Sequence, residues 1–401
     1  MKTTKFKPSE VGPIPVDWEV KRLGEIGDVV TGSTPPRDDM ECWGGNYNWI
    51  SAKDFKDKYI VDSEEKVTTK GMAFCRLLPS DSVLVTCIAS IGLNAIAKNP
   101  CATNQQINAV ICKACNNEYL YYQIEAAKDR MIELAGQTAV PIINKGDFEN
   151  LMIPVPPRPE QEKIAEALSD VDALLAAMTK LIEKKRAIKQ GAMQQLLTGK
   201  KRLAGFTGKR VEKRLGDVGE FVGGGTPSTT ISSYWGGDID WYTPAEIGYA
   251  KYVNSSNRRI TNEGLRNSAA RVLPAGAILL TTRASIGLRA ILKHEAATNQ
   301  GFQSLIVNEE SDSEFMYYFL STVAEEMESR ASGSTFLEIS SSKLKEIPIV
   351  VPQTVAEQQA IASVLSDMDA EIAALEATRA KYESIKQGMM QELLTGKTRL
   401  V

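Results

Sequence analysis

The peptide QGAMQQLLTGKKRL at residues 190–203 returns near the end of the chain as QGMMQELLTGKTRL at residues 387–400. Eleven of the fourteen positions are identical, and the two copies lie 197 residues apart. Unrelated segments do not agree over this length by chance, and similarity at a fixed separation is the signature of a repeated structural unit. The chain therefore contains an internal duplication, and two copies of one fold are expected.

Two more blocks recur in the same order. KRLGEIGDVVTGSTPPRDDMECWGGNYNW from Lys21 matches KRLGDVGEFVGGGTPSTTISSYWGGDIDW from Lys213, 192 residues later. LPSDSVLVTCIASIGLNAIAKNPCATNQ from Leu78 matches LPAGAILLTTRASIGLRAILKHEAATNQ from Leu273, 195 residues later. Because the separation grows only from 192 to 197, the copies differ by small insertions in loops.

Each copy begins with about 150 residues of mixed strand and helix patterns. The runs DSVLVT, GAILLTT, NAVICK and QSLIVN are short and apolar, which predicts buried strands. NEYLYYQIEAAKDRMIELA from Asn117 and SEFMYYFLSTVAEEMESRA from Ser313 have helical spacing and polar starts. The mixture predicts an α+β domain in each copy.

A long helix follows each mixed region. Apolar residues recur at alternating spacings of four and three, a period that favours a coiled-coil partner. In the first copy they are Ile164, Leu168, Val171, Leu175, Met178, Ile182 and Leu196, and in the second Ile361, Leu365, Met368, Ile372, Leu375, Tyr382, Met389 and Leu393. The alternative is that each helix packs only on its own domain.

Local signals mark the ends of these helices. Thr354 and Glu357 have the spacing of a capping box at the second start. Gly199 and Gly396 stand where left-handed caps would end the two helices. The predicted organisation is mixed domains at 1–155 and 206–350, each followed by a helical segment, at 156–205 and 351–401.

The composition is that of an ordinary globular protein. The 401 residues are 43% hydrophobic and carry a formal charge of −3, which does not favour coating of nucleic acid by electrostatics alone. No apolar run has the length of a membrane span and no signal peptide is evident, so a cytoplasmic location is expected. Seven cations between Lys200 and Arg214 form either a solvated linker or a phosphate-contacting face.

The sequence does not support a catalytic, metal or cofactor site. The C-x-x-C pair Cys112 and Cys115 has no counterpart in the second copy, and His294 is the single histidine. Gln391 stands where a phosphate-binding loop ending at Gly396 needs a glycine. Two pairs of carboxylates recur in the first third of each helix, where negative charge interacts favourably with the helix dipole. They are Asp170 with Asp172 and Asp367 with Asp369. No catalytic residue, bound cofactor or metal is expected.

Two mixed domains, each trailed by a near-identical long helix, resemble the specificity (S) subunit of type I restriction–modification enzymes. The resemblance covers nearly the whole chain and is carried by the repeated helix ends, the entries IPVPPRPEQEKIAEAL and IPIVVPQTVAEQQAIASVL, and the GSTP…WGG…W and GGTP…WGG…W blocks. It implies two pseudo-symmetric target-recognition domains separated by two long antiparallel coiled-coil helices. Each domain would read one half of an asymmetric bipartite DNA site.

The same resemblance implies partners. Two modification (methyltransferase) subunits would dock on the helices and bind S-adenosylmethionine, and restriction subunits would translocate and cut double-stranded DNA. The chain itself would be a non-catalytic recognition subunit. Two alternatives are the recognition chain of a type II system that both cuts and methylates, and a coiled-coil adaptor that binds no DNA.

Base readout requires hydrogen-bonding side chains on rigid supports. Candidates are polar residues whose chemistry changes between closely matching stretches, together with the late loops. In the first copy they are Ser51, Lys53, Asp54, Asn94, Gln137, Thr138, Asn144 and Lys145. In the second they are Thr243, Glu246, Arg283, Arg289, Ser334, Thr335 and Lys343.

Two repeated features are assigned to structure instead of readout. The retained TNQ sequence, at 103–105 and 298–300, is expected to form a turn that bonds its own backbone. Trp43 and Trp235 of the WGG motifs are expected to anchor packing. The shared peptides are therefore interpreted as scaffold or docking surface, and the differences between copies as readers of sequence.

Overall fold

The computed structural model describes residues 5–136, 139–333 and 337–400. The chain divides into two compact units, Met1–Thr179 with Ala377–Val401 (unit 1) and Lys180–Glu376 (unit 2). Each unit therefore holds one mixed region and one segment of each long helix. In the part of the chain that the structure describes, no helix is long and apolar enough to cross a membrane.

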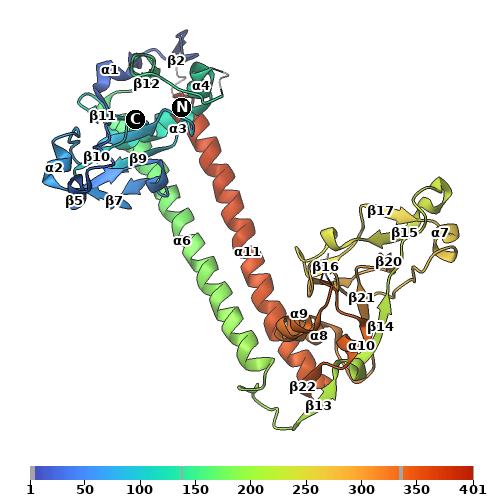
Figure 1. Ribbon diagram of the computed structural model, residues 1–401. Helices are drawn as coiled ribbons and strands as arrows, with labels where there is room; N and C mark the ends of the chain where they lie inside the picture. The colour runs from blue at the N-terminus through green and yellow to red at the C-terminus, as the bar shows by residue number, and fades with distance from the viewer. Residues whose placement is uncertain (1–4, 137–138, 334–336, 401) are drawn as a thin grey trace. The chain divides into compact units, whose positions relative to one another are not determined.

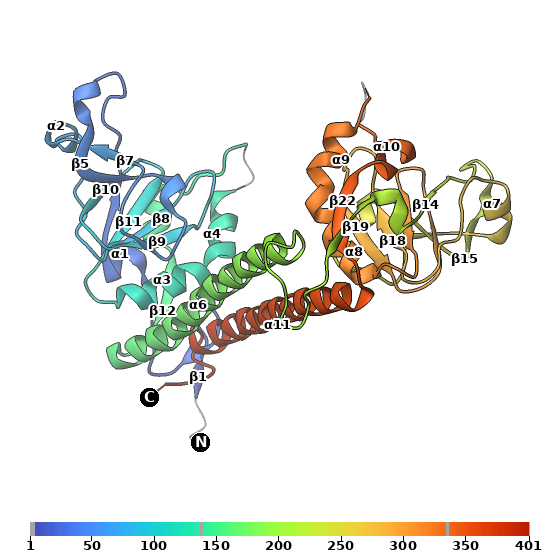
Figure 2. The same cartoon turned by 90° about the horizontal axis from the view of Figure 1, so that it is seen from below.

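A five-stranded mixed sheet forms the centre of each unit (Figures 1 and 2). In unit 1 its spatial order is β4 (Gly27–Thr31), β11 (Ile107–Cys112), β8 (Val83–Thr86), β9 (Asn94–Ala97) and β6 (Tyr59–Ile60). In unit 2 the order is β14 (Gly219–Gly223), β21 (Gln303–Val307), β18 (Ile278–Leu280), β19 (Arg289–Leu292) and β16 (Tyr252–Val253). Neighbours are antiparallel except the last pair, which is parallel in both units. The predicted strands and the predicted duplication are confirmed.

A three-stranded sheet accompanies the larger one in each unit. Its central strand is β5 (Trp43–Ile50) or β15 (Trp235–Tyr242), and its outer strands are β7 (Glu65–Val67) with β10 (Cys101–Thr103), or β17 (Arg258–Ile260) with β20 (Ala296–Thr298). The WGG motif produces a bulge at the start of each central strand. A Cβ on Gly45 would lie 2.3 Å from the Val67 carbonyl oxygen, and one on Gly237 would lie 2.5 Å from that of Ile260. The glycines are therefore required by close backbone approach.

Short helices and strand pairs complete the units. Unit 1 has β1 (Phe6–Lys7), β2 (Ile14–Pro15), β3 (Glu19–Arg22), α1 (Leu23–Ile26), α2 (Thr69–Met72), α3 (Asn117–Ala126), α4 (Lys128–Ala135), α5 (Lys145–Glu149) and β12 (Met152–Val155). Unit 2 has β13 (Arg210–Arg214), α7 (Asn262–Arg266), α8 (Ser313–Phe319), α9 (Ala324–Arg330), α10 (Ser341–Lys345) and β22 (Pro348–Pro352). The continuous helix expected from Asn117 is wrong in one respect, because the backbone at Ala127 leaves helical geometry and separates α3 from α4.

The two long helices are α6 (Arg158–Leu196) and α11 (Val355–Leu393). Within unit 1 they are antiparallel, since Asp172 pairs with Lys386 whereas the later Thr179 pairs with the earlier Arg379. Within unit 2, Lys189 of α6 likewise pairs with Asp369 of α11. The predicted α+β fold with paired antiparallel helices is confirmed.

Both ends of the helices can be compared with the sequence signals. Gly199 and Gly396 have φ of +77° and +70°, so the predicted left-handed caps are confirmed. The capping box is only half formed, because Thr354 Oγ1 accepts the Glu357 N–H at 3.4 Å while the Glu357 carboxylate pairs with Arg202 instead. The Glu357 carboxylate therefore binds a guanidinium that is distant in sequence and does not accept the backbone N–H of Thr354.

The helix seams serve two purposes. Ile164 and Leu168 of α6 belong to the unit 1 core, and Leu196 of α6 belongs to the unit 2 core. Between them, Met178 and Ile182 are also buried, as the coiled-coil spacing predicts. Packing on a domain and pairing of helices therefore share one apolar stripe.

Candidate nucleic-acid interface

A short turn follows the central strand of the small sheet in each unit. Asp54 accepts hydrogen bonds from the Ser51 N–H at 2.8 Å and hydroxyl at 3.1 Å, and Glu246 accepts the same pair from Thr243 at 2.8 and 2.7 Å. Each carboxylate also accepts a backbone N–H from ten or eleven residues further on. The structure gives these four candidates a role in holding the turn, and Lys53 is the exposed charge on it.

The hairpin loop between β8 and β9, or β18 and β19, is strained in the same way in both units. Ala89 and Ala284 have φ of +62° and +63°. The N–H of the next residue, Ser90 or Ser285, donates to the carbonyl of the residue before the alanine at 2.8 Å. A side chain in this region is uncommon, and such strain concentrates at functional sites. Both serines are exposed.

In unit 2 several candidate loops meet around one shallow pocket. It has a volume of about 330 Å³ and is lined by Pro244, Arg283, Ala284, Ser285, Asn299, Gln300 and Gly301. These residues come from the turn after Thr243, the strained hairpin and the TNQ turn. The structure therefore brings Arg283 and the turn that begins at Thr243 to the same pocket, which Pro244 lines and Thr243 does not.

The two units differ in chemistry at this hairpin. Arg283 forms an antiparallel bridge to Glu338, and its Nε lies 3.7 Å from that carboxylate. At the same position in unit 1, Ile88 forms a bridge to Ile142, whose side chain is half exposed. One unit presents a charged pair where the other presents an apolar pair.

Asn94 and Arg289 were expected to differ as readers, but they make the same internal contact. Asn94 is buried and donates from Nδ2 to the Tyr121 carbonyl at 3.0 Å. Arg289 donates from Nε to the Tyr317 carbonyl at 2.5 Å. Desolvation lowers the pKa of Arg289 from its usual value. The structure therefore assigns both side chains to packing between a strand and a helix.

The late loops are only partly described. Asn144 caps α5 by accepting the Asp147 N–H at 2.9 Å, and Lys145 pairs with Glu149 at 3.2 Å. Lys343 donates to the backbone carbonyl at the end of α9 at 3.0 Å. The candidates Gln137, Thr138, Ser334 and Thr335 lie outside the described residues.

The basic stretch from Lys200 to Arg214 makes side-chain contacts through three of its cations. Arg202 pairs with Glu357 at 2.6 Å, Arg210 donates to the Leu197 carbonyl at 2.5 Å, and Lys213 pairs with Glu310 at 2.6 Å. These contacts fix the end of α6 and the strand β13. This part of the stretch has a structural role.

The WGG tryptophans pack edge-on against the second tryptophan of the same strand. The ring centroids are 5.0 Å apart for Trp43 and 5.1 Å apart for Trp235, with an interplanar angle of 87° in both units. A guanidinium covers each outer ring, from Arg37 at 4.0 Å and from Arg258 at 3.7 Å. This arrangement fits the expected packing role.

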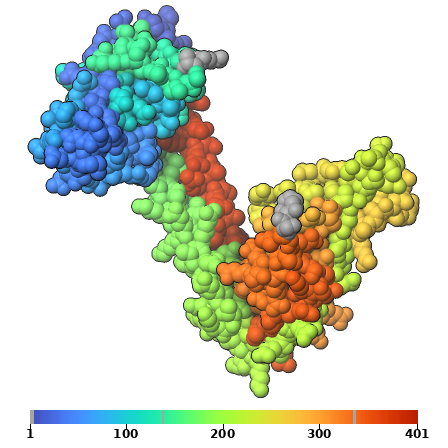
Figure 3. Space-filling view, viewed as in Figure 1, coloured from blue at the N-terminus to red at the C-terminus, as the bar shows by residue number. Residues whose placement is uncertain are grey.

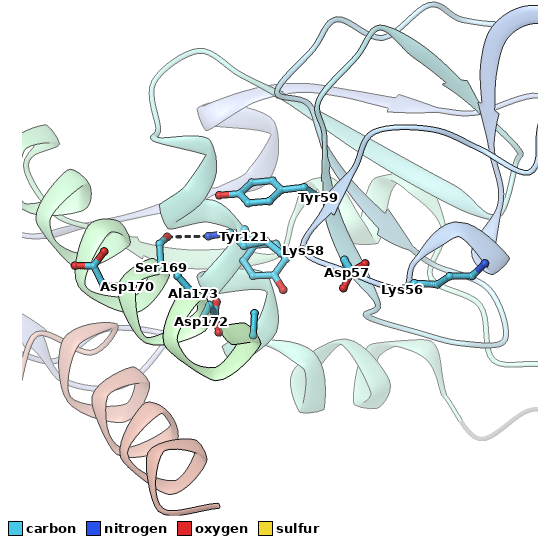
Figure 4. A pocket seen from close by; sticks show the side chains of 10 residues that line it. Lys56, Asp57, Lys58, Tyr59, Tyr121, Ser169, Asp170, Asp172 and Ala173 are labelled. Carbon is cyan, nitrogen blue, oxygen red and sulfur yellow. Dashed lines mark hydrogen bonds between the residues drawn. The ribbon is translucent and has the colours of Figure 1, made fainter. Parts of the chain in front are cut away.

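A partly buried polar network joins each mixed region to both long helices. In unit 1, Lys58 donates to Ser169 Oγ at 2.8 Å (Figure 4). It also donates to the Tyr122 hydroxyl at 3.0 Å. Tyr122 donates to Asp172 Oδ2 at 2.6 Å, and Lys386 of α11 pairs with Asp172 Oδ1 at 2.5 Å. The network borders a pocket of about 740 Å³ between the β6 loop and α6.

Unit 2 repeats this network with the helices exchanged. Lys251 donates to Ser366 Oγ at 2.7 Å and to the Tyr318 hydroxyl at 3.3 Å, and Tyr318 donates to Asp369 Oδ2 at 2.5 Å. The aspartate now lies on α11, and its lysine partner, Lys189, lies on α6. In each unit, equivalent contacts therefore hold the mixed region against segments of both long helices.

Sequence reasoning missed this network. Its signal was present in the repeated Lys-Tyr pair of KYI and KYV and in the repeated Ser-x-x-Asp of SDVD and SDMD. One carboxylate of each repeated pair, Asp172 or Asp369, is held by a tyrosine and a lysine. This contact gives those carboxylates a structural use.

Removing the Tyr122 hydroxyl is expected to weaken unit 1. Tyr122→Phe leaves Asp172 with one partner fewer, so the free energy of unfolding should fall by about 1–2 kcal/mol at pH 7. Burial and the Asp172 carboxylate raise the pKa of Tyr122 far above its usual value. Unfolded tyrosine ionises near pH 10, so the wild type should lose stability above about that pH, and the variant should lose less.

Denaturant unfolding at pH 7 and above pH 10 measures both effects. Tyr318→Phe should behave alike in unit 2, whereas Tyr47→Phe at an exposed ring should change little. Equal pH dependence of Tyr122→Phe and wild type would contradict the assigned contact.

No metal site is evident among the residues that the structure describes. No group of three or more histidine, cysteine, aspartate or glutamate side chains is placed there to hold an ion. Burial raises the pKa of Cys112 and Cys115 to about 12, which favours the thiol over the metal-binding thiolate.

Similarity to known proteins is consistent along the whole chain. The family described as type I restriction modification DNA specificity domain matches residues 15–189 and 209–387. The putative type I restriction enzyme MjaX specificity subunit of Methanocaldococcus jannaschii is 28% identical over 445 residues, covering 100% of this chain and 98% of its own. The MjaIX specificity subunit of the same organism is 44% identical over 161 residues, covering 39% of this chain and 37% of its own.

Solved structures agree with the fold. The S subunit of a type I restriction–modification system from M. genitalium aligns with a TM-score of 0.59 at 17% identity, over 98% of both chains. The HsdS subunit of Thermoanaerobacter tengcongensis aligns with a TM-score of 0.52 at 18% identity, over 96% of this chain and 98% of that one. Because the family match spans both repeats, the chain belongs to the family of type I restriction–modification DNA specificity subunits.

Proposed function

We propose that each unit reads one half of an asymmetric, bipartite DNA site. One observation carries this proposal. The two units have the same fold, but the side chains on their corresponding loops differ in chemistry. Arg283 and Glu338 replace Ile88 and Ile142 at the hairpin, and the exposed Lys53 has alanine as its counterpart in unit 2. Two readers of one shape with different side chains suit two half-sites of different sequence.

The described candidates for DNA contact differ in the contacts that they make within the protein. The candidates on described surface turns or at short helices are Ser51, Lys53, Thr243, Arg283, Asn144, Lys145 and Lys343. Gln137, Thr138, Ser334 and Thr335 are proposed as further contacts and lie outside the described residues. Asp54 and Glu246 act through the turns that they hold. The internal contacts of Asn94 and Arg289 favour a supporting role.

The long helices are proposed to set the gap between half-sites and to dock two modification subunits. Parts of α6 and α11 lie on the surface (Figure 3). Exposed apolar side chains on them are Leu174, Leu181, Ile188 and Ile385. Because the two networks present the helices in the same way, two copies of one partner could use equivalent surfaces.

The chemistry is proposed to reside in the partners. The modification subunits would bind S-adenosylmethionine and methylate, the restriction subunits would translocate and cut, and this chain would act with them on cytoplasmic DNA without a catalytic residue or cofactor of its own. The engagement of Asp172 and Asp369 in lysine pairs supports a structural use of the repeated carboxylates.

Exchanging one reader tests this function. Replacing residues 206–350 with the same region of another specificity subunit should change the sequence of one half-site completely and leave the other half unaltered. Each domain has its own cores, so the exchange should not disturb unit 1. Mapping methylated bases in DNA modified by the assembled complex measures the result, and altered sequence in both halves would contradict the proposal.

A further inference from the structure

A glutamine is held in the same pose on the proposed DNA-reading surface of each unit. The Thr34 hydroxyl donates to Gln105 Oε1 at 2.5 Å, and the Thr226 hydroxyl donates to Gln300 Oε1 at 2.5 Å. Both glutamines are exposed. The threonine hydroxyl occupies one acceptor site of the amide carbonyl and holds the amide group, which leaves both N–H donors of the NH₂ group for a ligand.

The turn that carries the glutamine is built with little freedom. Asn104 Oδ1 accepts the N–H two residues on at 3.0 Å, and Asn299 does so at 2.9 Å, so the predicted backbone-bonding turn is confirmed. A Cβ on Gly32 would lie 2.2 Å from the Asn104 carbonyl oxygen, and one on Gly224 would lie 2.0 Å from that of Asn299. The Gly-x-Thr segment therefore lies directly against the turn and positions the threonine hydroxyl.

The pose is common to both units although the surroundings differ. Gln300 lines the pocket that also contains Arg283 and the strained Ala284. In unit 1 the residue after Gln105 accepts the Cys87 N–H at 2.8 Å, as Gly301 accepts that of Thr282 at 2.9 Å, which ties the turn to the same hairpin. A shared donor is thus placed beside the residues that distinguish the two readers.

We infer that Gln105 and Gln300 each donate an amide N–H to a DNA phosphate oxygen, at equivalent positions of the two half-sites. This inference rests on the proposed function. A contact made identically by two readers of different sequence must address a group that every sequence offers, and the phosphate backbone is such a group. A base contact would require the same base in both halves. The glutamines thus set the register in which neighbouring side chains read bases.

Binding of duplex DNA by the complex assembled with its modification subunits tests this role. Gln105→Ala should weaken binding about 3- to 10-fold, the range of one neutral hydrogen bond, and by the same factor for cognate and non-cognate duplexes. The slope of log affinity against log salt should not change, because glutamine neutralises no phosphate. Gln300→Ala should give the same loss, and the double variant should show the product of the two factors.

A second variant separates donation from packing. Gln105→Glu keeps an oxygen to accept the Thr34 hydroxyl but has no donor and brings a negative charge. Its loss should exceed that of Gln105→Ala and should grow as salt is lowered. Gln353→Ala, at an exposed glutamine outside these loops, is the matched control and should bind as the wild type does.

Three results would overturn the inference: unchanged binding by Gln105→Ala, a loss confined to the cognate duplex, or tighter binding by Gln105→Glu than by Gln105→Ala. Failure of the wild-type complex to distinguish cognate from non-cognate DNA would instead overturn the proposed function. The two outcomes can be told apart. The first is read from the affinities of the glutamine variants, and the second from the affinities of the wild-type complex for cognate and non-cognate duplexes.

Discussion

A seven-residue insertion in both long helices is expected to widen the gap between the half-sites by about three base pairs. Seven helical residues add about 10.5 Å at 1.5 Å each, and base pairs of B-DNA are about 3.4 Å apart. A whole heptad keeps the apolar seam in phase, so the helices can remain paired. Both half-site sequences should stay the same, because neither reader is altered.

The boundaries of the two units define where to insert. Placing one heptad between Thr179 and Lys180 and another between Glu376 and Ala377 leaves the internal contacts of each unit intact. Methylation of a library of sites with different gaps gives the preferred gap. An unchanged preference in a complex that still methylates would remove the spacer role from the helices.

An insertion in α6 alone is the control. It shifts Lys189 by two helical turns relative to Asp172, while their partners Asp369 and Lys386 on α11 stay in place. The two sets of interhelical ion pairs can then no longer form together. Reduced thermal stability is expected for this variant and not for the double insertion.

The sequence predicted the fold well because the signals for strands, helix caps and the helix seam are local, and because each signal occurs in both copies of the repeat. The strands around Val83 and Ile278 follow from short apolar runs, and the left-handed caps at Gly199 and Gly396 follow from a residue type that this geometry favours. The spacing of Met178 and Ile182 likewise predicted a buried seam. Each feature depends on neighbours within a few residues.

The candidate site was harder to predict because side-chain roles depend on distant partners. Asn94 and Arg289 differ in sequence, yet both bind a tyrosine carbonyl 27 or 28 residues away. Asp54 could have been recognised by its three-residue spacing from Ser51, as in a capping box. A difference in side-chain type between the copies therefore did not identify a reader of DNA at these positions, because both side chains bind an equivalent backbone carbonyl.

The terminal part of the repeated peptide explains the largest expected loss of stability. Arg399 donates to both carboxylate oxygens of Glu160 at 2.7 Å and to both of Asp17 at 2.9 and 2.7 Å. Trp18, which is fully buried, donates from Nε1 to Glu160 at 3.0 Å. Glu160 at the start of α6 therefore joins the first strands of unit 1 to the end of the chain.

Glu160→Ala is expected to lower the free energy of unfolding of unit 1 by about 3–5 kcal/mol, the usual loss when one partner of a buried ion pair is removed. Glu160 is 2% exposed, so neither the indole N–H nor the guanidinium regains water easily. Among the described residues, the equivalent Glu357 has one such partner, Arg202, and its Oε1 accepts no hydrogen bond. Glu357→Ala should therefore lose clearly less.

Denaturant unfolding of the full chain measures these differences. Glu162→Ala is the matched control, because Glu162 lies near Glu160 on the same helix and makes an exposed pair with Arg158. Its effect should stay within about 0.5 kcal/mol. If Glu160→Ala and Glu357→Ala lose the same free energy, then the added Trp18 and Asp17 contacts contribute nothing. The Arg399–Glu160 pair would then stabilise unit 1 no more than the Arg202–Glu357 pair stabilises unit 2.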